Sequence, residues 1–287
     1  MKLLSSFFLL LIYASFGFAQ EAGSAEMFPA PAGKLFIIGG GKRPPALVQS
    51  LVQASGLDTG GYAIILPMAS SEPDTAAYYG IRQFTKQGLA AEKFRAYNFA
   101  KGDYPKAAID SLLGARLIYI TGGDQNRFME VVLGSPVYDA IHQAYSNGAT
   151  IAGTSAGAAV MSRKMITGNE YKHPEYTGDY RTIEAENIEI KEGLGLLPEA
   201  IVDQHFVYRM RMNRLITVAL ENPNEACIGI DESTAILVEG NRATVVGGYQ
   251  VILLRNPGKD SREMNGLLGG RGLELSVLLP GDGFRLK

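Results

Sequence analysis

Residues 149–157 read ATIAGTSAG, an apolar run that leads into a turn with a serine between two glycines. The run Ala149–Ala152 has the small and apolar composition of a strand that is covered on both faces. A helix-like segment, Ala158–Arg163, follows the turn. A strand, a tight turn and a helix in this order are the repeating unit of α/β proteins, so this stretch predicts a fold built on a parallel sheet.

The same alternation continues on both sides of this stretch. Downstream, residues 235–238 and 243–246 flank a short polar turn and predict a hairpin, and residues 249–255 and 273–279 predict two further strands. We therefore expect an α/β fold, a mostly parallel sheet covered by helices on both faces, with antiparallel strands near the C-terminus. Upstream, the pattern predicts strands at Lys34–Ile38, Tyr62–Leu66, Phe94–Phe99 and Ala115–Ile120, and helices at Ala46–Ala54, Thr75–Gln87, Lys106–Leu113 and Val137–Asn147.

Composition excludes several classes of function. The 287 residues carry 27 Lys and Arg against 29 Asp and Glu, a net charge of −2, so no excess of positive charge points to a nucleic-acid partner. One cysteine, Cys227, rules out an intramolecular disulfide and a cysteine metal cluster, and three histidines argue against a histidine metal site. Gly39–Gly41 lacks the spacing of a dinucleotide-binding loop and is interpreted as a turn. We expect neither a metal nor an organic cofactor.

The N-terminus has the pattern of a secretory leader. A short positive start precedes the apolar run Leu3–Ala14, and Gly17–Ala19 supplies a small-x-small cleavage site. The alternative is a membrane anchor, but the run is shorter than the ~20 residues that span a bilayer. We expect a signal peptide at 1–19, a flexible lead-in at 20–33 and a single catalytic domain at 34–287. The mature protein is then exported, periplasmic or secreted, without a stable membrane anchor.

Ser155 is the candidate nucleophile. The segment Gly153–Gly157 matches the G-x-S-x-G elbow, in which a strained turn exposes the serine hydroxyl at the start of a helix. The amide of Ala156 would then face the oxygen that becomes negative on attack. The alternative is a glycine-rich turn with an ordinary capping serine.

A second turn, Thr121–Gln125, follows another predicted strand. Its backbone amides are candidates to complete an oxyanion hole, and Gln125 is a candidate substrate contact. The alternative is a helix N-cap at Asp124, since Asp is a favoured capping residue.

His205 is the best candidate base. It follows the apolar run Ala200–Val202, at the carboxyl end of a predicted strand, where functional residues of α/β sheets gather. His142 lies inside a predicted helix and His173 lies in a polar segment predicted as a loop. A hydrogen-bonded structural histidine is the alternative interpretation of His205.

The residues alone leave the third catalytic group open. Among the nine acidic residues between Ser155 and His205, Glu170 is favoured because it ends a possible short strand. Asp231 and Glu232 follow a later strand, and they could bind a guanidinium or cap a turn. Three arginines after His205 form either a solvated helix face or a set of carboxylate clamps, namely Arg209, Arg211 and Arg214.

Four motifs stand in order along the chain: Gly122–Gln125, Gly153–Ala158, Asp203–Phe206 with the three arginines, and Gly229–Glu232. Together they resemble the cyanophycinases, serine peptidases related to dipeptidase E. The resemblance runs from about Leu35 to about Val246 and implies a class I glutamine amidotransferase-like fold. It also implies hydrolysis of cyanophycin, a poly-aspartate chain with arginine on each side-chain carboxylate, to β-aspartyl-arginine dipeptides through a Ser-His-Glu triad and an acyl-enzyme.

By the same resemblance Ser155 is the nucleophile, His205 the base, and amides near Gly123 and Ala156 hold the oxyanion. The acid is expected after the serine, and Glu170 is favoured because related enzymes carry their acid at a similar distance from the serine. Residues 169–192 are longer and more polar than the family pattern, so Glu175 stays open. A homodimer is also implied. A peptidase for short β-aspartyl or acidic peptides and a non-catalytic binding module are the alternatives. The implied substrate contacts are Gln125, Asp203, Gln204, Arg209, Arg211 and Arg214.

Overall fold

The computed structural model describes residues 32–175, 177, 180 and 182–287. The predicted leader, residues 1–19, lies outside the described residues, and so does the predicted lead-in except for its last two residues. In the part of the chain that is described, no helix combines the length and the apolar character needed to cross a membrane.

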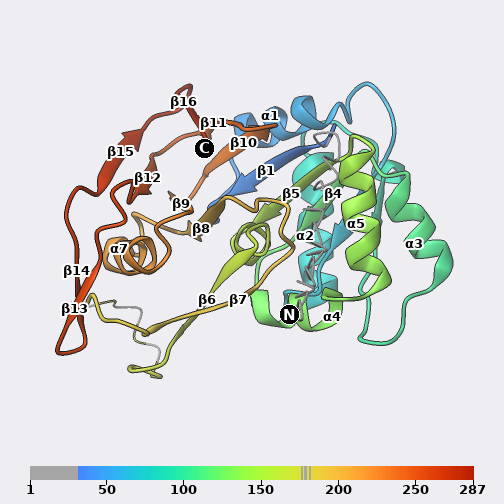
Figure 1. The fold of residues 1–287 in the computed structure, drawn as a ribbon. Coiled ribbons are helices and arrows are strands. Elements are labelled where there is room, and N and C mark those ends of the chain that lie inside the picture. Colours follow the sequence, from blue (N-terminus) through green and yellow to red (C-terminus); the bar gives the residue numbers. More distant parts are fainter. Residues whose placement is uncertain (1–31, 176, 178–179, 181) are drawn as a thin grey trace, which may run out of the picture.

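An eight-stranded sheet forms the centre of the fold (Figure 1), in the order β16-β11-β10-β1-β5-β4-β2-β3. A hairpin and a last short strand extend it in antiparallel fashion beyond β1: β10 (Thr234–Glu239), β11 (Arg242–Gly247) and β16 (Gly283–Arg285). The parallel part consists of β1 (Lys34–Ile38), β5 (Thr150–Thr154), β4 (Leu117–Ile120), β2 (Ala63–Leu66) and β3 (Phe94–Ala96). The predicted parallel sheet with antiparallel C-terminal strands is thus confirmed.

Helices cover both faces of this sheet, as the alternation of side chains along β1 shows. Phe36 and Ile38 pack in one apolar cluster with residues of α1 (Pro45–Ser55) and α2 (Pro73–Thr85). Leu35 and Ile37 point to the other face, into a larger cluster. That cluster includes residues of α3 (Lys106–Leu113), α4 (Gln125–Val132), α5 (Pro136–Ser146) and α6 (Ala156–Ala159).

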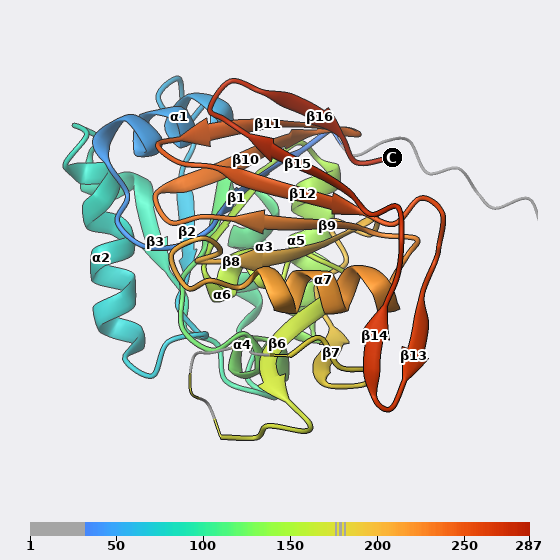
Figure 2. The ribbon, with the colours of Figure 1, turned by 90° about the vertical axis from the view of Figure 1, so that its left-hand side faces the viewer.

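The C-terminal third contributes a second sheet, in the order β15-β12-β9-β8, whereas the sequence pattern predicts these strands without dividing them from the first sheet. Its strands β8 and β9 are parallel, whereas β12 and β15 pair antiparallel. Helix α7 (Met212–Glu221) packs against it (Figure 2). Residues of β8, β9 and β12 also belong to the larger cluster, so the two sheets share a core. The strands are β8 (Ala200–Gln204), β9 (Ala226–Ile230), β12 (Val251–Arg255) and β15 (Glu274–Leu278).

Three short elements complete the described chain. They are the hairpin of β6 (Lys164–Glu170) with β7 (Ile188–Glu192), the hairpin of β13 (Arg262–Met264) with β14 (Leu267–Gly269), and the 3₁₀ turn η1 (Ala91–Lys93).

Candidate active site

Ser155 lies in the turn between β5 and α6, with φ 54° and ψ −112°. A positive φ is unusual for a residue with a side chain, so this backbone is held by its surroundings. The two glycines of the motif allow the close packing. A Cβ on Gly153 would lie 2.1 Å from the carbonyl oxygen of Gly157, and a Cβ on Gly157 would lie 2.4 Å from that of Ile120. The strand and the turn predicted around the serine are therefore present, whereas the helix after them is the single turn Ala156–Ala159 and not the predicted Ala158–Arg163.

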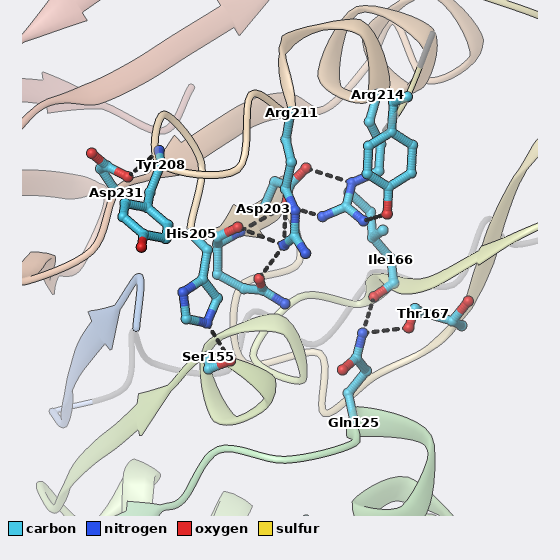
Figure 3. Close-up of polar contacts among 12 residues, drawn as sticks. Gln125, Ser155, Ile166, Thr167, Asp203, His205, Tyr208, Arg211, Arg214 and Asp231 are labelled. Carbon is cyan, nitrogen blue, oxygen red and sulfur yellow. Dashed lines mark hydrogen bonds and ion pairs between the residues drawn. The ribbon is translucent and has the colours of Figure 1, made fainter. Parts of the chain in front are cut away.

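His205 follows β8 and faces Ser155 across the ends of the two sheets (Figure 3). Its Nε2 lies 2.8 Å from Oγ of Ser155. The backbone of His205 also has a positive φ, 50°, and its amide donates a hydrogen bond of 2.7 Å to the carbonyl of Gly39, at the end of β1. This bond ties the end of the second sheet to the end of the first. The predicted nucleophile and base are thus brought into direct contact.

Glu232 completes this chain of contacts. Its Oε1 lies 2.6 Å from Nδ1 of His205. The residue comes from the turn that joins β9 to β10. Because β9 pairs with β8 while β10 pairs with β1, this turn reaches the edge at which both other residues lie.

The prediction that the acid lies between the serine and the histidine differs from this geometry. Glu170 ends β6 and accepts a hydrogen bond of 2.7 Å from Nδ2 of Asn187, on the approach to β7. Glu175 is exposed in the loop beyond β6. Both lie in the hairpin of β6 and β7 or in its loop, whereas the carboxylate beside His205 comes from a later part of the chain. The sequence singles out the turn that contains Glu232 for its two carboxylates, but it predicts that they bind a guanidinium or cap the turn.

The surroundings of His205 favour its neutral form. Burial lowers the pKa of His205 below its ordinary value, the hydrogen bond to Glu232 opposes this shift, and the positive charge of Arg209 adds to it. With Glu232 accepting the Nδ1 proton, Nε2 is left as an acceptor for the serine hydroxyl. A neutral imidazole positioned in this way can take a proton from the serine as it attacks a carbonyl carbon.

The glycine triplet at the end of β1 makes room for this pair. Gly40 has φ 112°, and a Cβ there would lie 2.5 Å from Nε2 of His205. Gly41 has φ 68°, and a Cβ there would lie 2.5 Å from Oε2 of Glu232. The sequence of the triplet predicts only a turn. Its position, at the end of a strand of the same sheet as Ser155, is the signal that could have linked it to the site.

The loop after β4 carries one of the two predicted oxyanion amides, that of Gly123, and α6 begins with the other, that of Ala156. A Cβ on Gly122 would be 3.3 Å from Cβ of Ser155, so the loop after β4 passes directly beside the serine. Neither the amide of Gly123 nor that of Ala156 donates to a backbone carbonyl among the described residues. Asp124, the alternative N-cap, does accept a hydrogen bond of 2.8 Å from the amide of Asn126 at the start of α4. Capping and an oxyanion role for the neighbouring glycine are compatible.

Two of the residues predicted to contact substrate, Asp203 and Arg214, bind each other instead. Arg214 donates from Nε to Oδ2 of Asp203 at 2.7 Å and from Nη2 to Oδ1 (Figure 3). The guanidinium also lies 4.6 Å from the ring centroid of Tyr180 and donates to its hydroxyl. The Arg214 and Asp203 side chains are 1% and 0% exposed. This pair is part of the core under the site rather than a surface open to substrate.

The other predicted contacts differ in exposure. Arg211 is buried and donates from Nη1 to the carbonyl of Gln204, at 2.6 Å, and to its side-chain oxygen. Gln125 donates from Nε2 to the carbonyls of Ile166 and Thr167, at 3.0 and 2.5 Å, and so anchors β6 beside α4. Arg209, by contrast, is exposed, and its charge acts on His205.

A cleft of 190 Å³ opens beside the serine, lined among others by Ser155, His205, Gly122 and Tyr79. No group of three metal-binding side chains occurs among the residues described. A serine hydroxyl and an imidazole that is hydrogen-bonded to a carboxylate thus face a cleft that is large enough for part of a peptide.

Comparison with known proteins shows the family of the chain. The chain matches peptidase family S51 over residues 35–246. It is 35% identical to a cyanophycinase of Nostoc sp. over 237 residues, 78% of this chain and 75% of that protein, and 31% identical to a cyanophycinase of Geminocystis herdmanii over 233 residues, 78% and 82%.

Solved structures agree on the fold. A peptidase from an acI-B1 Actinobacterium superposes with a TM-score of 0.65 at 22% identity, covering 88% of this chain and 96% of that one. A putative peptidase E protein of Listeria monocytogenes gives a TM-score of 0.52 at 16% identity, covering 75% and 98%. These two similarities show the fold, and the sequence matches show the family. The chain therefore belongs to peptidase family S51, and it is a serine peptidase.

Proposed function

We propose that this chain hydrolyses cyanophycin to β-aspartyl-arginine dipeptides, with Ser155 as nucleophile on an elbow, His205 as base and Glu232 as the acid that orients it. The observation that carries the proposal is the unbroken path from Oγ of Ser155 to Nε2 of His205, 2.8 Å, and from Nδ1 to Glu232, 2.6 Å. Relatives that are themselves cyanophycinases support the choice of substrate.

The first half of the reaction forms an acyl-enzyme. Oγ of Ser155 attacks the carbonyl carbon of the scissile amide while Nε2 of His205 takes the hydroxyl proton. Glu232 stabilises the resulting imidazolium, and the amides of Gly123 and Ala156 donate to the tetrahedral oxyanion. When the intermediate collapses, the C–N bond breaks and the leaving nitrogen takes the proton from His205.

The second half releases the product. A water molecule gives a proton to Nε2 of His205 and attacks the ester carbonyl of the acylated Ser155. Collapse of this second intermediate breaks the ester bond, and the proton on His205 returns to Oγ. The free enzyme is restored, with every proton accounted for by the imidazole and the water.

A test uses the purified protein with insoluble cyanophycin and identifies the released products by mass spectrometry. Wild type is expected to release β-aspartyl-arginine, and Ser155→Ala is expected to lose several orders of magnitude in kcat. Ser276→Ala, on exposed β15, removes a hydroxyl far from the site and serves as the matched control. Release of dipeptide from short isopeptides but not from the polymer would move the proposal to a peptidase for β-aspartyl or acidic peptides. A folded Ser155→Ala protein with near-wild-type turnover would reject the assigned nucleophile.

We also propose that the protein is exported, on the strength of the leader pattern at 1–19. Expression of the full chain in a bacterial host with fractionation is the test. A mature protein that begins at Gln20 and is found outside the cytoplasm is expected. An uncleaved chain in the cytoplasmic fraction would overturn this part of the proposal. Light scattering of the same preparation tests the implied homodimer.

A further inference from the structure

A second cleft continues from the one beside Ser155. It has a volume of 320 Å³ and lies along α2 and the loop before α1. Arg43 and Tyr79 line both clefts, so the two depressions meet at these side chains. Arg82 and Lys86 lie farther out, at the end of α2. A ligand bound at Ser155 can therefore extend past Arg43 towards them.

The lining of this continuous groove is positively charged. Arg43, Arg82 and Lys86 line it, and no Asp or Glu among the described residues does. In the described part of the chain, none of these three cations takes part in an ion pair. A cleft lined by one sign of charge attracts the opposite charge more strongly than a flat surface does. The net charge of the whole chain is −2, so the positive groove is a local feature.

Arg43 is held in place for such a role. Its Nε donates to Oε1 of Gln83 at 2.6 Å, and its Nη1 lies 3.4 Å from the carbonyl of Gly41. Gly41 in turn packs against the carboxylate of Glu232. The guanidinium is thus fixed from two sides next to the residues around His205, and its other N–H groups are left to donate to a ligand. A pre-positioned guanidinium loses little freedom when it binds a carboxylate.

We propose that Arg43, Arg82 and Lys86, with Tyr79 between them, form a subsite for free carboxylates of the substrate, which we call the cationic groove. The inference rests on the proposed function in one respect, that the scissile carbonyl lies at Ser155. Each arginine branch of cyanophycin keeps its own α-carboxylate, and acidic peptides carry several carboxylates, so both substrate classes offer groups that fit. The groove selects substrates that are anionic on this side of the cleaved bond.

Binding without turnover tests the groove directly. In the Ser155→Ala background, the affinity for penta-aspartate is measured by calorimetry with and without Arg82→Gln/Lys86→Gln. The double substitution is expected to weaken binding about three- to tenfold and to flatten its dependence on salt, as loss of two exposed charge contacts does. The matched control is Lys259→Gln/Arg262→Gln, which removes the same charge near β13, on the side of the molecule opposite α2 (Figure 2). The proposal is rejected if the groove variant binds penta-aspartate with unchanged affinity, or if the control variant loses as much affinity as the groove variant does.

Turnover separates this inference from the proposed function. In an active enzyme the groove variant is expected to raise KM about three- to tenfold with kcat within about twofold of wild type. If the groove variant loses affinity for penta-aspartate but the wild-type protein does not hydrolyse cyanophycin, the groove is supported and cyanophycin is rejected as the substrate. Cyanophycin hydrolysis with unchanged KM in the groove variant would retain the function and reject the groove.

Discussion

The carboxylate of Glu232 lies 2.6 Å from Nδ1 of His205, although it follows the histidine by 27 residues. The chain order is therefore serine, histidine, glutamate. The contact depends on the turn between β9 and β10, which carries Glu232 from the second sheet back to the first. It fixes the imidazole with Nε2 towards Ser155, 2.8 Å away.

Replacement of Glu232 by Gln is expected to lower kcat about 10³- to 10⁴-fold, because an amide can stabilise the wrong tautomer of His205 and cannot stabilise the imidazolium. Glu170→Gln is the matched control, since that carboxylate contacts Asn187 rather than the imidazole, and should change kcat less than about threefold. Steady-state kinetics on one substrate measure both. The opposite ranking would return the acid to the position after the serine.

The pH profile should report the neutral form of His205. Burial, with help from Arg209, lowers its pKa, so the imidazole stays deprotonated to a lower pH than a free histidine does. The value of kcat/KM is expected to rise with pH through a pKa below the ordinary value of about 6.5 and then to level off. Arg209→Gln removes a charge that lowers this pKa, so the acid limb should move to higher pH. A limb that does not move, or moves to lower pH, would contradict this electrostatic coupling.

Gly40→Ala should damage the site more than the fold. The new methyl would overlap the His205 ring and the residue would keep a φ of 112°, so the imidazole must shift. We expect a loss of about 10²-fold in kcat and about 1–3 kcal/mol in the free energy of unfolding. Gly258→Ala is the control, because a Cβ at that position would meet no atom within 4 Å. Near-wild-type kcat in Gly40→Ala, measured alongside denaturant unfolding, would show that the ring tolerates the methyl.

Arg214→Met should act on stability. It removes the bidentate partner of the buried Asp203 carboxylate and leaves only Arg211, whose Nη1 lies 3.5 Å from Oδ1. The loss is expected to cost about 3 kcal/mol in unfolding free energy. The exposed Arg209→Gln should change that free energy by less than about 0.5 kcal/mol. Urea unfolding followed by circular dichroism distinguishes them. A stable Arg214→Met protein with a raised KM would instead place Arg214 in contact with substrate.

Local sequence does not predict the short strands β7, β13, β14 and β16. It does predict the strands of the parallel sheet, the hairpin of β10 with β11 and most of the helices, and it points to Ser155 and His205, whose side chains lie in contact. Those predictions rest on features confined to a few neighbouring residues: apolar runs, glycines that allow a tight turn, and the end of a strand. The predicted helix Lys106–Leu113 has the bounds of α3, and the predicted hairpin after residue 234 is present. Even the choice of His205 needed only the rule that functional residues gather at strand ends.

Tertiary structure alone decided which carboxylate lies beside His205, what the glycine triplet packs against and how deeply each arginine is buried. Glu232 meets His205 because β10 pairs with β1 while β9 pairs with β8, and pairing of distant strands has no local signal. Arg209 and Arg214 look equivalent in sequence, yet one is exposed and the other is buried against Asp203. The physical reason is the same in each case: strand order and burial arise from packing of the whole chain, whereas a motif records only its own neighbourhood.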